Sequence, residues 1–161
     1  MKWDALVDEQ CSVARTSAVL GDRWTLVILT ECFLGVNTFE AFRSRLDISR
    51  TTLTNRLQQL QEHGILVQVP YQEKPTRNKY KLTEKGRELY PVIVTLADWG
   101  DKYYSDDAGP PILRKHTKCG HDFHAVLGCA ECGEEIDLRQ VTARKRPENS
   151  QYPPVLRGPV G

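Results

Sequence analysis

The sequence predicts an α+β fold, mainly α-helical, in which a helix-turn-helix is followed by a β-hairpin, a long helix and a small appendage. Three observations predict it. Leu53, Leu57 and Leu60 recur at helical spacing and mark the buried stripe of a helix whose opposite face is polar. Two strand-like stretches, 65–71 and 79–82, follow with turn-forming residues between them. Beyond them, helical periodicity returns before a segment rich in cysteine.

Composition sets the broad class of protein. The chain has 161 residues, 40% hydrophobic and 27% charged, which is enough for one core and a small appendage. It holds no long apolar run and no basic-then-apolar leader, so we expect no membrane span, no signal peptide and a cytoplasmic location. The formal charge is only +1, but residues 36–85 hold nine Lys and Arg against five Asp and Glu. This local excess of positive charge suits a surface that faces phosphates.

Two helices are predicted before the helix-turn-helix. Residues 12–20 have the pattern of a short helix that ends near Gly21. Residues 23–34 are apolar almost all round, which predicts the central core helix, and Gly35 ends it. The expected core side chains of this helix are Trp24, Leu26, Ile28, Leu29 and Phe33.

The helix-turn-helix is predicted from two short helices and their caps. Thr38 is placed to cap a helix over 39–46, and Ser49 to cap the helix that carries the leucine stripe. Gly64 ends this second helix, because glycine readily adopts the left-handed conformation found at helix C-termini. Two short helices joined by a tight turn, the second polar outward, are typical of a helix-turn-helix.

The outward face of the second helix predicts a nucleic-acid contact. It carries hydroxyl, amide and guanidinium groups and no carboxylate, and such groups hydrogen-bond base edges and neutralise phosphates. We assign base edges to Thr51, Thr52 and Asn55. Arg50 and Arg56 are assigned to phosphates or the minor groove. Taken alone, the polar face of this helix is explained equally well as an ordinary solvent-facing surface. The segments that flank the helix in the sequence are therefore needed to choose between the two interpretations.

The predicted hairpin supplies a second part of this surface. The segment between its strands is turn-rich and carries Lys74 and Arg77, which are assigned to phosphates or the minor groove. A helix-turn-helix followed directly by a hairpin with a basic tip is a winged helix-turn-helix, whose wing can place a cation beside the minor groove. A plain surface hairpin is the alternative. Ser49 and Lys79 complete the predicted DNA-binding set.

A long helix is predicted from Thr83, its cap, to about Tyr104. Pro91 would kink this helix or mark a break in its first turn. Its apolar stripe is longer than a small winged helix can cover, so we expect it to be a dimerisation helix that packs on a second copy. Two-fold symmetry would then present two recognition helices to a palindromic DNA site. The stripe consists of Leu89, Val92, Ile93, Leu96, Trp99 and Tyr103.

An ordered set of motifs resembles one family. The motifs are Cys11-Ser-Val-Ala-Arg15, Gly21-Asp-Arg-Trp-Thr-Leu-Val-Ile-Leu29, Phe39-x-x-Phe-Arg43, Leu53-Thr-x-Arg-Leu57, Glu62-His-Gly-Ile65, Tyr80-Lys-Leu-Thr-Glu-Lys-Gly86 and Asp98-Trp-Gly100. Over roughly residues 11–104 the chain resembles the HxlR-type winged helix-turn-helix transcriptional regulators, relatives of the MarR group. The resemblance implies a bacterial or archaeal DNA-binding homodimer, joined through terminal helices, and not an enzyme. One departure is Ser12, where members commonly have proline; Ser12 can instead cap its helix.

The resemblance also singles out Cys11, because some family members respond to electrophiles or oxidants through a cysteine near the N-terminus. At a helix start and one turn from Arg15, its thiolate would be favoured, which makes Cys11 a candidate redox sensor. The alternative is a small buried residue at a helix-packing interface. Cys32, inside the core helix, is expected to serve packing only.

The C-terminal segment predicts a metal site. Five cysteines, an odd count without an export signal, favour metal binding or a reactive thiol over disulfides. The pattern ligand-x-x-Cys-Gly occurs twice and turns two side chains toward one point. It predicts one structural, tetrahedral Zn²⁺ in a zinc ribbon-like module, bound by His116, Cys119, Cys129 and Cys132. His121 or His124 could replace His116, and a degenerate ribbon without metal is the alternative.

The predicted organisation has three parts: a DNA-binding and dimerisation domain over 11–108, the zinc ribbon-like module over 112–141 and a flexible tail over 142–161. The predicted function is sequence-specific transcriptional regulation by a homodimer that answers to an electrophile, an oxidant or another small molecule. The rival hypothesis is a protein-interaction module that uses the zinc ribbon-like extension, with DNA binding incidental. A zinc enzyme is disfavoured, because no Glu or His stands beside an open metal position.

Overall fold

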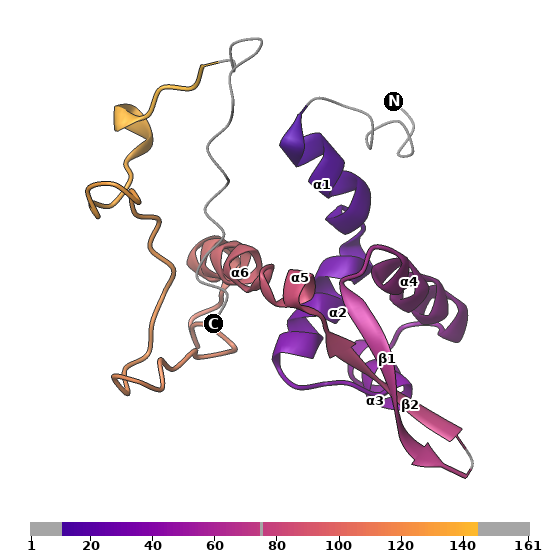
Figure 1. Cartoon of the computed structure of the whole chain (residues 1–161). Helices are drawn as coiled ribbons and strands as arrows, with labels where there is room; N and C mark the ends of the chain where they lie inside the picture. Colours follow the sequence, from indigo (N-terminus) through magenta and orange to yellow (C-terminus); the bar gives the residue numbers. More distant parts are fainter. Residues whose placement is uncertain (1–10, 75, 145–161) are drawn as a thin grey trace. The chain divides into compact units, whose positions relative to one another are not determined.

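The computed structural model of the chain describes residues 11–74 and 76–144 (Figure 1). The chain divides into two compact units, residues 1–125 and 126–161, called unit 1 and unit 2 below. The elements of unit 1 are α1 (Ser12–Leu20), α2 (Arg23–Phe33), α3 (Phe39–Leu46), α4 (Arg50–Glu62), β1 (Leu66–Glu73), β2 (Thr76–Leu82), α5 (Glu84–Arg87) and α6 (Tyr90–Tyr104). The predicted tail lies outside the described residues except for 142–144.

The two predicted caps of the helix-turn-helix are confirmed. The Thr38 hydroxyl accepts a hydrogen bond from the Ala41 N–H at 3.4 Å and begins α3. The Ser49 hydroxyl accepts one from the Thr52 N–H at 3.1 Å and begins α4. Each bond satisfies a backbone donor that the first helical turn cannot pair, which fixes where both helices start.

The start of α1 differs from the expectation. Cys11, and not Ser12, is the N-cap residue, and no side chain accepts a hydrogen bond there. Ser12 is the first helical residue, and its hydroxyl accepts a hydrogen bond from the Arg15 guanidinium at 3.1 Å. The Ser12 hydroxyl therefore forms a hydrogen bond on the surface of α1 and does not cap the helix.

A residue with positive φ makes the turn between α3 and α4. Asp47 ends α3 with φ of 47°, in the left-handed region that Asp tolerates better than most side chains. Ile48 follows and is buried at 4% exposure, so the turn is held by an apolar anchor as well as by its geometry. Together these two residues set the direction in which α4 leaves α3.

One hydrophobic core joins α2, α3, α4 and the hairpin. The leucine stripe of α4 is buried as predicted, and so are Ile28 and Leu29 of the core helix. Trp24, Leu26 and Phe33 are only partly buried and pack around the edge of this core. The buried apolar residues are Leu20, Ile28, Leu29, Phe42, Ile48, Leu53, Leu57, Leu60, Ile65, Leu66, Tyr80, Ile93 and Val94.

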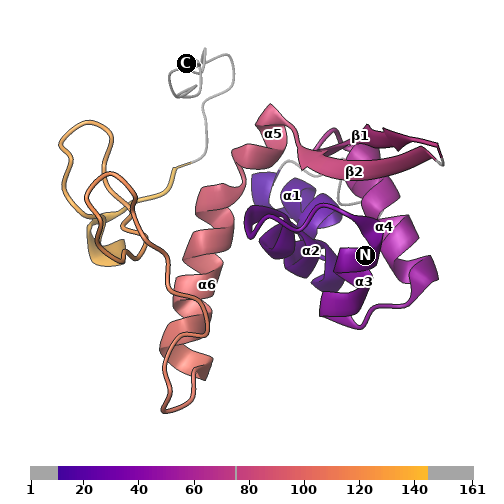
Figure 2. The ribbon, with the colours of Figure 1, turned by 90° about the horizontal axis from the view of Figure 1, so that it is seen from below.

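The hairpin is longer than the sequence indicated. Strands β1 and β2 pair antiparallel from Leu66 opposite Leu82 to Glu73 opposite Thr76, so most of the predicted loop is paired backbone. The register shifts between Pro70 and Gln72, a β-bulge that increases the local twist. Figure 2 shows the hairpin tip at one end of unit 1, while α6 leads away at the other end.

The long C-terminal helix is interrupted. Thr83 caps only the short helix α5, where its hydroxyl accepts a hydrogen bond from the Gly86 N–H at 3.1 Å. Helix α6 starts afresh with Pro91 in its first turn, where proline fits because its missing N–H would be unpaired anyway. The break is one of the two outcomes expected for Pro91. Among the described residues, no helix has both the length and the apolar character needed to cross a membrane.

Candidate functional site

Helix α4 has one buried face and one open polar face. Leu53, Leu57 and Leu60 are at most 1% exposed. Thr51 and Asn55, two of the predicted base contacts, lie on the exposed face. Thr52, the third, is half-buried, and its hydroxyl lies 2.8 Å from that of Ser49 at the cap. The other exposed polar residues of this face are Thr54, Gln58 and Gln59.

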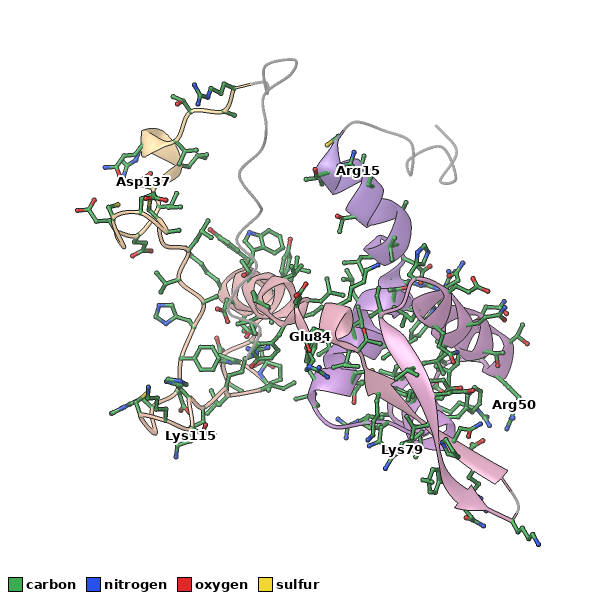
Figure 3. All side chains as sticks on the ribbon, viewed as in Figure 1. Arg15, Arg50, Lys79, Glu84, Lys115 and Asp137 are labelled. Atoms are coloured by element: carbon green, nitrogen blue, oxygen red, sulfur yellow. The ribbon has the colours of Figure 1, made fainter. Side chains whose placement is uncertain are left out.

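Arg50 lies at the first position of α4, and its side chain projects from that end of the helix (Figure 3). Its Nη2 is 3.2 Å from Glu40 Oε1 on α3, and its guanidinium lies 5.2 Å from the centroid of the Phe39 ring. The Arg50 side chain is 65% exposed, and such an exposed ion pair contributes about 1 kcal/mol or less. Arg50 can therefore exchange Glu40 for a phosphate at small cost.

Arg56 is turned toward the body of unit 1. Its Nε lies 3.1 Å from Asp22 Oδ1 in an ion pair without hydrogen-bond alignment, and Nη1 donates to Gln59. The Asp22 carboxylate also caps α2 by accepting from the Trp24 N–H at 2.9 Å. One carboxylate thus connects the start of α2 to the middle of α4, and a phosphate would have to compete with it for Arg56.

The wing carries its cations on alternate residues of β2. Lys74 and Arg77, near the turn, are exposed, and Lys79 is half-buried. Lys81 is exposed as well, and the two-residue period of a strand places it on the same face as Arg77 and Lys79. Lys81 lies outside the predicted DNA-binding set, although the alternation of the sequence from 77 to 81 already places it on this face.

A second, apolar surface lies on α1 and α6. Val13 of α1 is 72% exposed, and Val92, Leu96, Trp99 and Tyr103 of α6 are between 43% and 59% exposed. We call these five side chains the α1–α6 surface. A groove runs between the two helices and is lined largely by apolar atoms from Val13, Leu20, Leu26, Val92 and Leu96. Exposed apolar area of this extent on one face is typical of an interaction site.

Two cysteines of unit 1 differ in environment. Cys11 is exposed at the N-cap of α1, and its backbone carbonyl accepts from the Arg15 N–H. Burial raises the pKa of the Cys32 thiol to about 12, with the Glu31 carboxylate adding to the effect. Cys32 therefore stays a protonated, packed thiol at neutral pH, as expected.

The first ligand-x-x-Cys-Gly pattern forms a tight turn in unit 1. The Gly120 N–H donates to the His116 carbonyl at 2.7 Å, and Gly120 has φ of 78°. His116 Nδ1 and Cys119 Sγ lie 3.2 Å apart, so both side chains point to one place. Residue 114 holds the segment beside α6, since Arg114 Nη1 lies 3.7 Å from both Asp98 and Asp101.

The second pattern forms the same turn in unit 2. The Gly133 N–H donates to the Cys129 carbonyl at 2.8 Å, and Gly133 has φ of 77°. Backbone donors of Cys132 and Glu131, followed by the Cys132 side chain, lower the pKa of the Cys129 thiol. In the part of the chain that the structure describes, no three His, Cys, Asp or Glu side chains form a ready metal cluster. Each turn by itself brings two of the predicted ligands together.

A helix-turn-helix with an open polar recognition helix, followed by a wing with basic side chains, defines the class of winged-helix DNA-binding proteins. The chain belongs to the HxlR-like helix-turn-helix family, whose model matches residues 19–108. It is a transcriptional regulator with a DNA-binding fold, and the expected family is confirmed.

Similar proteins extend the match beyond the winged helix. An HTH-type transcriptional regulator of Mycobacterium tuberculosis, Rv3095, is 46% identical over 136 residues, covering 84% of this chain and 86% of that protein. The crystal structure of PA1607, a candidate transcription factor, has a TM-score of 0.79 and 27% identity, covering 88% of this chain and 99% of that one. The redox regulator HypR in its oxidised form has a TM-score of 0.55 and 30% identity, covering 60% of this chain and all of that one, 100%. The first two matches are longer than the family region.

Proposed function

We propose that the protein regulates transcription as a homodimer that binds a palindromic DNA site in a sequence-specific way. The observation that carries the proposal is the division of α4, where fully buried leucines fix the helix and Thr51 and Asn55 stand open on the other side. A helix held in this way can enter the major groove as a rigid recognition helix. The exposed cations Arg50, Lys74 and Arg77 supply phosphate contacts around it.

The α1–α6 surface supports the dimer. Its apolar side chains are exposed in one copy of the chain, although burying them would release ordered water at a favourable free energy of roughly 25 cal/mol per Å². The same surface on a second copy is complementary in character, and a two-fold axis places identical patches against each other. In this proposal α6 is the dimerisation helix, and the two copies of α4 face successive major grooves.

The response to oxidants or electrophiles is assigned to Cys11. The thiol is exposed, and Ser12 and Val13, which follow it, line the groove of the α1–α6 surface. Addition of an electrophile to this thiol would place a new group at the edge of the proposed dimer interface. The structural likeness to HypR, described as a redox regulator, supports this assignment.

A protein-interaction role of the C-terminal extension remains the second hypothesis. It is favoured by the exposed apolar side chains of unit 2, among them Leu127 at 71% and Leu138 at 85%. Salt dependence separates the two hypotheses, because phosphate contacts release counterions and protein contacts of apolar type do not.

The test is selection of bound duplexes from a random DNA library with the full-length protein, followed by titration of the selected site at several salt concentrations. We expect a palindromic consensus, two protein chains per duplex and affinity that falls steeply with salt. Binding without sequence preference, or a salt dependence close to flat, would refute the proposal and favour the protein-interaction hypothesis.

A further inference from the structure

We propose that a pocket between α1 and α5 is an effector site that binds a small apolar carboxylate through Arg15 and Lys85. The proposal names a class of small molecule that would release the protein from DNA. Its regulatory part rests on the proposed function, whereas binding of the ligand is measured without DNA.

The pocket lies within unit 1 and has a volume of about 260 Å³. This is slightly below the range of roughly 300–1,000 Å³ typical of drug-sized ligands, so the pocket suits a small molecule. Leu20 and Ile65 in its wall are buried side chains of the hydrophobic core. Val19 and Leu89, which also line it, pack against the same core. An aromatic ring or a short alkyl chain would displace water from this apolar wall.

Two cations complete the lining of the pocket. Arg15 comes from α1 and Lys85 from α5, and no Asp or Glu among the described residues lines the pocket. The Arg15 guanidinium donates to the Ser12 hydroxyl at 3.1 Å, and a carboxylate is a stronger acceptor than this neutral hydroxyl. An apolar wall with two cations is complementary to an apolar molecule that carries one negative charge. The planar guanidinium matches the geometry of a carboxylate in particular.

Lys85 also stabilises the end of the recognition helix. Its Nζ donates to the carbonyl of His63, the C-cap residue of α4, at 2.8 Å. Beside it, the Thr83 hydroxyl donates to the Gly64 carbonyl at 2.6 Å. The last carbonyls of a helix carry a partial negative charge and have no partner within the helix, so an ammonium group at this position stabilises α4.

The two roles of Lys85 compete with each other. A carboxylate in the pocket carries a full negative charge and is therefore a stronger acceptor than the His63 carbonyl. Lys85 would turn from α4 toward the ligand, and the end of the recognition helix would lose a hydrogen bond. A ligand that binds this rearranged state more tightly shifts the population toward it. The protein should then bind DNA more weakly when the ligand is present.

Isothermal titration calorimetry of the full-length protein without DNA tests the site, with benzoate as the probe. Benzamide has the same ring without the charge, and inorganic phosphate has a charge without the ring. We expect one benzoate to bind per chain and both comparison compounds to bind more weakly by about tenfold or more. No binding of benzoate, or equal binding of either comparison compound, would overturn the proposal.

Single variants test the two charge partners. Lys85→Met keeps a long aliphatic chain and removes the ammonium group, so it should bind benzoate more weakly by about tenfold. Arg15→Met should change the affinity in the same direction. Lys102→Met, at an exposed lysine of α6 outside the pocket lining, is the matched control and should bind benzoate as the parent does. Circular dichroism confirms that the helices of each variant are folded. Binding equal to that of the parent in both Lys85→Met and Arg15→Met would overturn the assignment.

The regulatory part is tested with the DNA site selected from the random library. We expect saturating benzoate to weaken DNA binding by the parent and to leave that of Lys85→Met unchanged. Benzoate binding without an effect on DNA affinity would overturn the coupling through Lys85. If benzoate binds but no DNA sequence is selected, the proposed function fails and the ligand site stands. Sedimentation shows whether benzoate binds only to monomers, and that result would overturn the proposal because a second copy would then cover the pocket.

Discussion

Asn55 projects from the exposed face of α4, and its side-chain amide can pair with the edge of one base. We expect Asn55→Ala to bind the selected site more weakly by roughly 1–3 kcal/mol and to lose preference at a single base pair. Fluorescence anisotropy against the site and its single-base variants measures both effects. Gln58→Ala, a change on the same face further along α4, tests whether base recognition is confined to the first turns of the helix. Equal loss at every base pair in Asn55→Ala would contradict a base contact.

Cys32 should resist modification while the protein is folded. Because burial raises its pKa to about 12 from an ordinary 9.0, the thiol is protonated at neutral pH, whereas Cys11 is exposed. We expect iodoacetamide to label Cys11 in the folded protein and Cys32 only after unfolding, as peptide mapping would show.

The same raised pKa makes a prediction about stability. The unfolded thiol ionises near 9, before the folded one, so the neutral Cys32 stabilises the fold below that pH and less as pH rises toward 12. Urea unfolding at pH 7 and about pH 11 should show a smaller loss of stability for Cys32→Ala than for the parent chain. Equal losses would show that Cys32 does not carry this effect.

At the scale of single residues, the sequence predicted side-chain contacts within one helix, and it did not predict contacts between helices. The caps Thr38 and Ser49 were readable because their partners lie three residues away. The ion pair between Arg56 and Asp22 joins two helices far apart in sequence, and no local pattern reveals it. For the same reason the roles of the DNA-contacting set stay predictions, since the partner that would define them is a nucleic acid.

At the scale of elements, the wing has a test of its own. Lys74 is exposed near the hairpin turn and is proposed to contact phosphate. Lys74→Ala should weaken binding to all DNA sequences alike and lower the slope of log affinity against log salt by about one. Lys115→Ala, at an exposed lysine far from the wing in sequence, is the control and should leave the slope unchanged. A change in base preference caused by Lys74→Ala would argue for a base contact instead.

The junction of α5 with the hairpin depends on a glycine. A Cβ at Gly86 would stand 2.3 Å from the Ile65 carbonyl oxygen, a backbone atom that cannot turn aside. Gly86→Ala should therefore lower the free energy of unfolding by roughly 1–3 kcal/mol. Gly100→Ala, inside α6 with nothing within 4 Å of its Cβ, should be neutral or stabilise the protein by about 0.5–1 kcal/mol. Urea titration of both variants measures their free energies of unfolding. Equal values would contradict the close contact between Gly86 and the Ile65 carbonyl oxygen.

The elements themselves were largely predictable, because each has a strong periodicity and a local start or stop signal. The hairpin and the start of α6 show which details the sequence left open. Hairpin pairing from Glu73 to Thr76 comes from backbone hydrogen bonds that any side chains permit, so a turn-rich composition concealed it. The interruption before α6 arises at Leu89, where Pro91 favours a fresh first turn over a continuous helix.

At the scale of the whole molecule, the α1–α6 surface should control assembly. Leu96 is 48% exposed in the middle of it, and a carboxylate there would be buried without a partner in the proposed dimer. Leu96→Asp should yield monomers in analytical ultracentrifugation and reduce DNA affinity, with the helical content unchanged. Thr95→Asp adds the same charge at the neighbouring exposed position outside the surface and is the control. A dimeric Leu96→Asp protein would refute this interface.

The C-terminal extension was the part of the molecule for which sequence and structure gave different kinds of information. The sequence supplied the donor types and their spacing, from which zinc was predicted. The structure adds the common hydrogen-bond geometry of the two turns. Within each turn, two of the donors from which zinc was predicted lie close together.

The Asp22 carboxylate, which caps α2 and pairs with Arg56, has a consequence for the choice of binding sites in a genome. It connects the recognition helix to the core, so the proposed two-fold dimer would have one fixed distance between its two copies of α4. Two half-sites on the same face of DNA lie about one helical turn apart, and an insertion of half a turn moves the second to the opposite face. A dimer with a fixed distance between its recognition helices could not contact both half-sites after that displacement. Its targets should therefore share one spacing even where their bases differ.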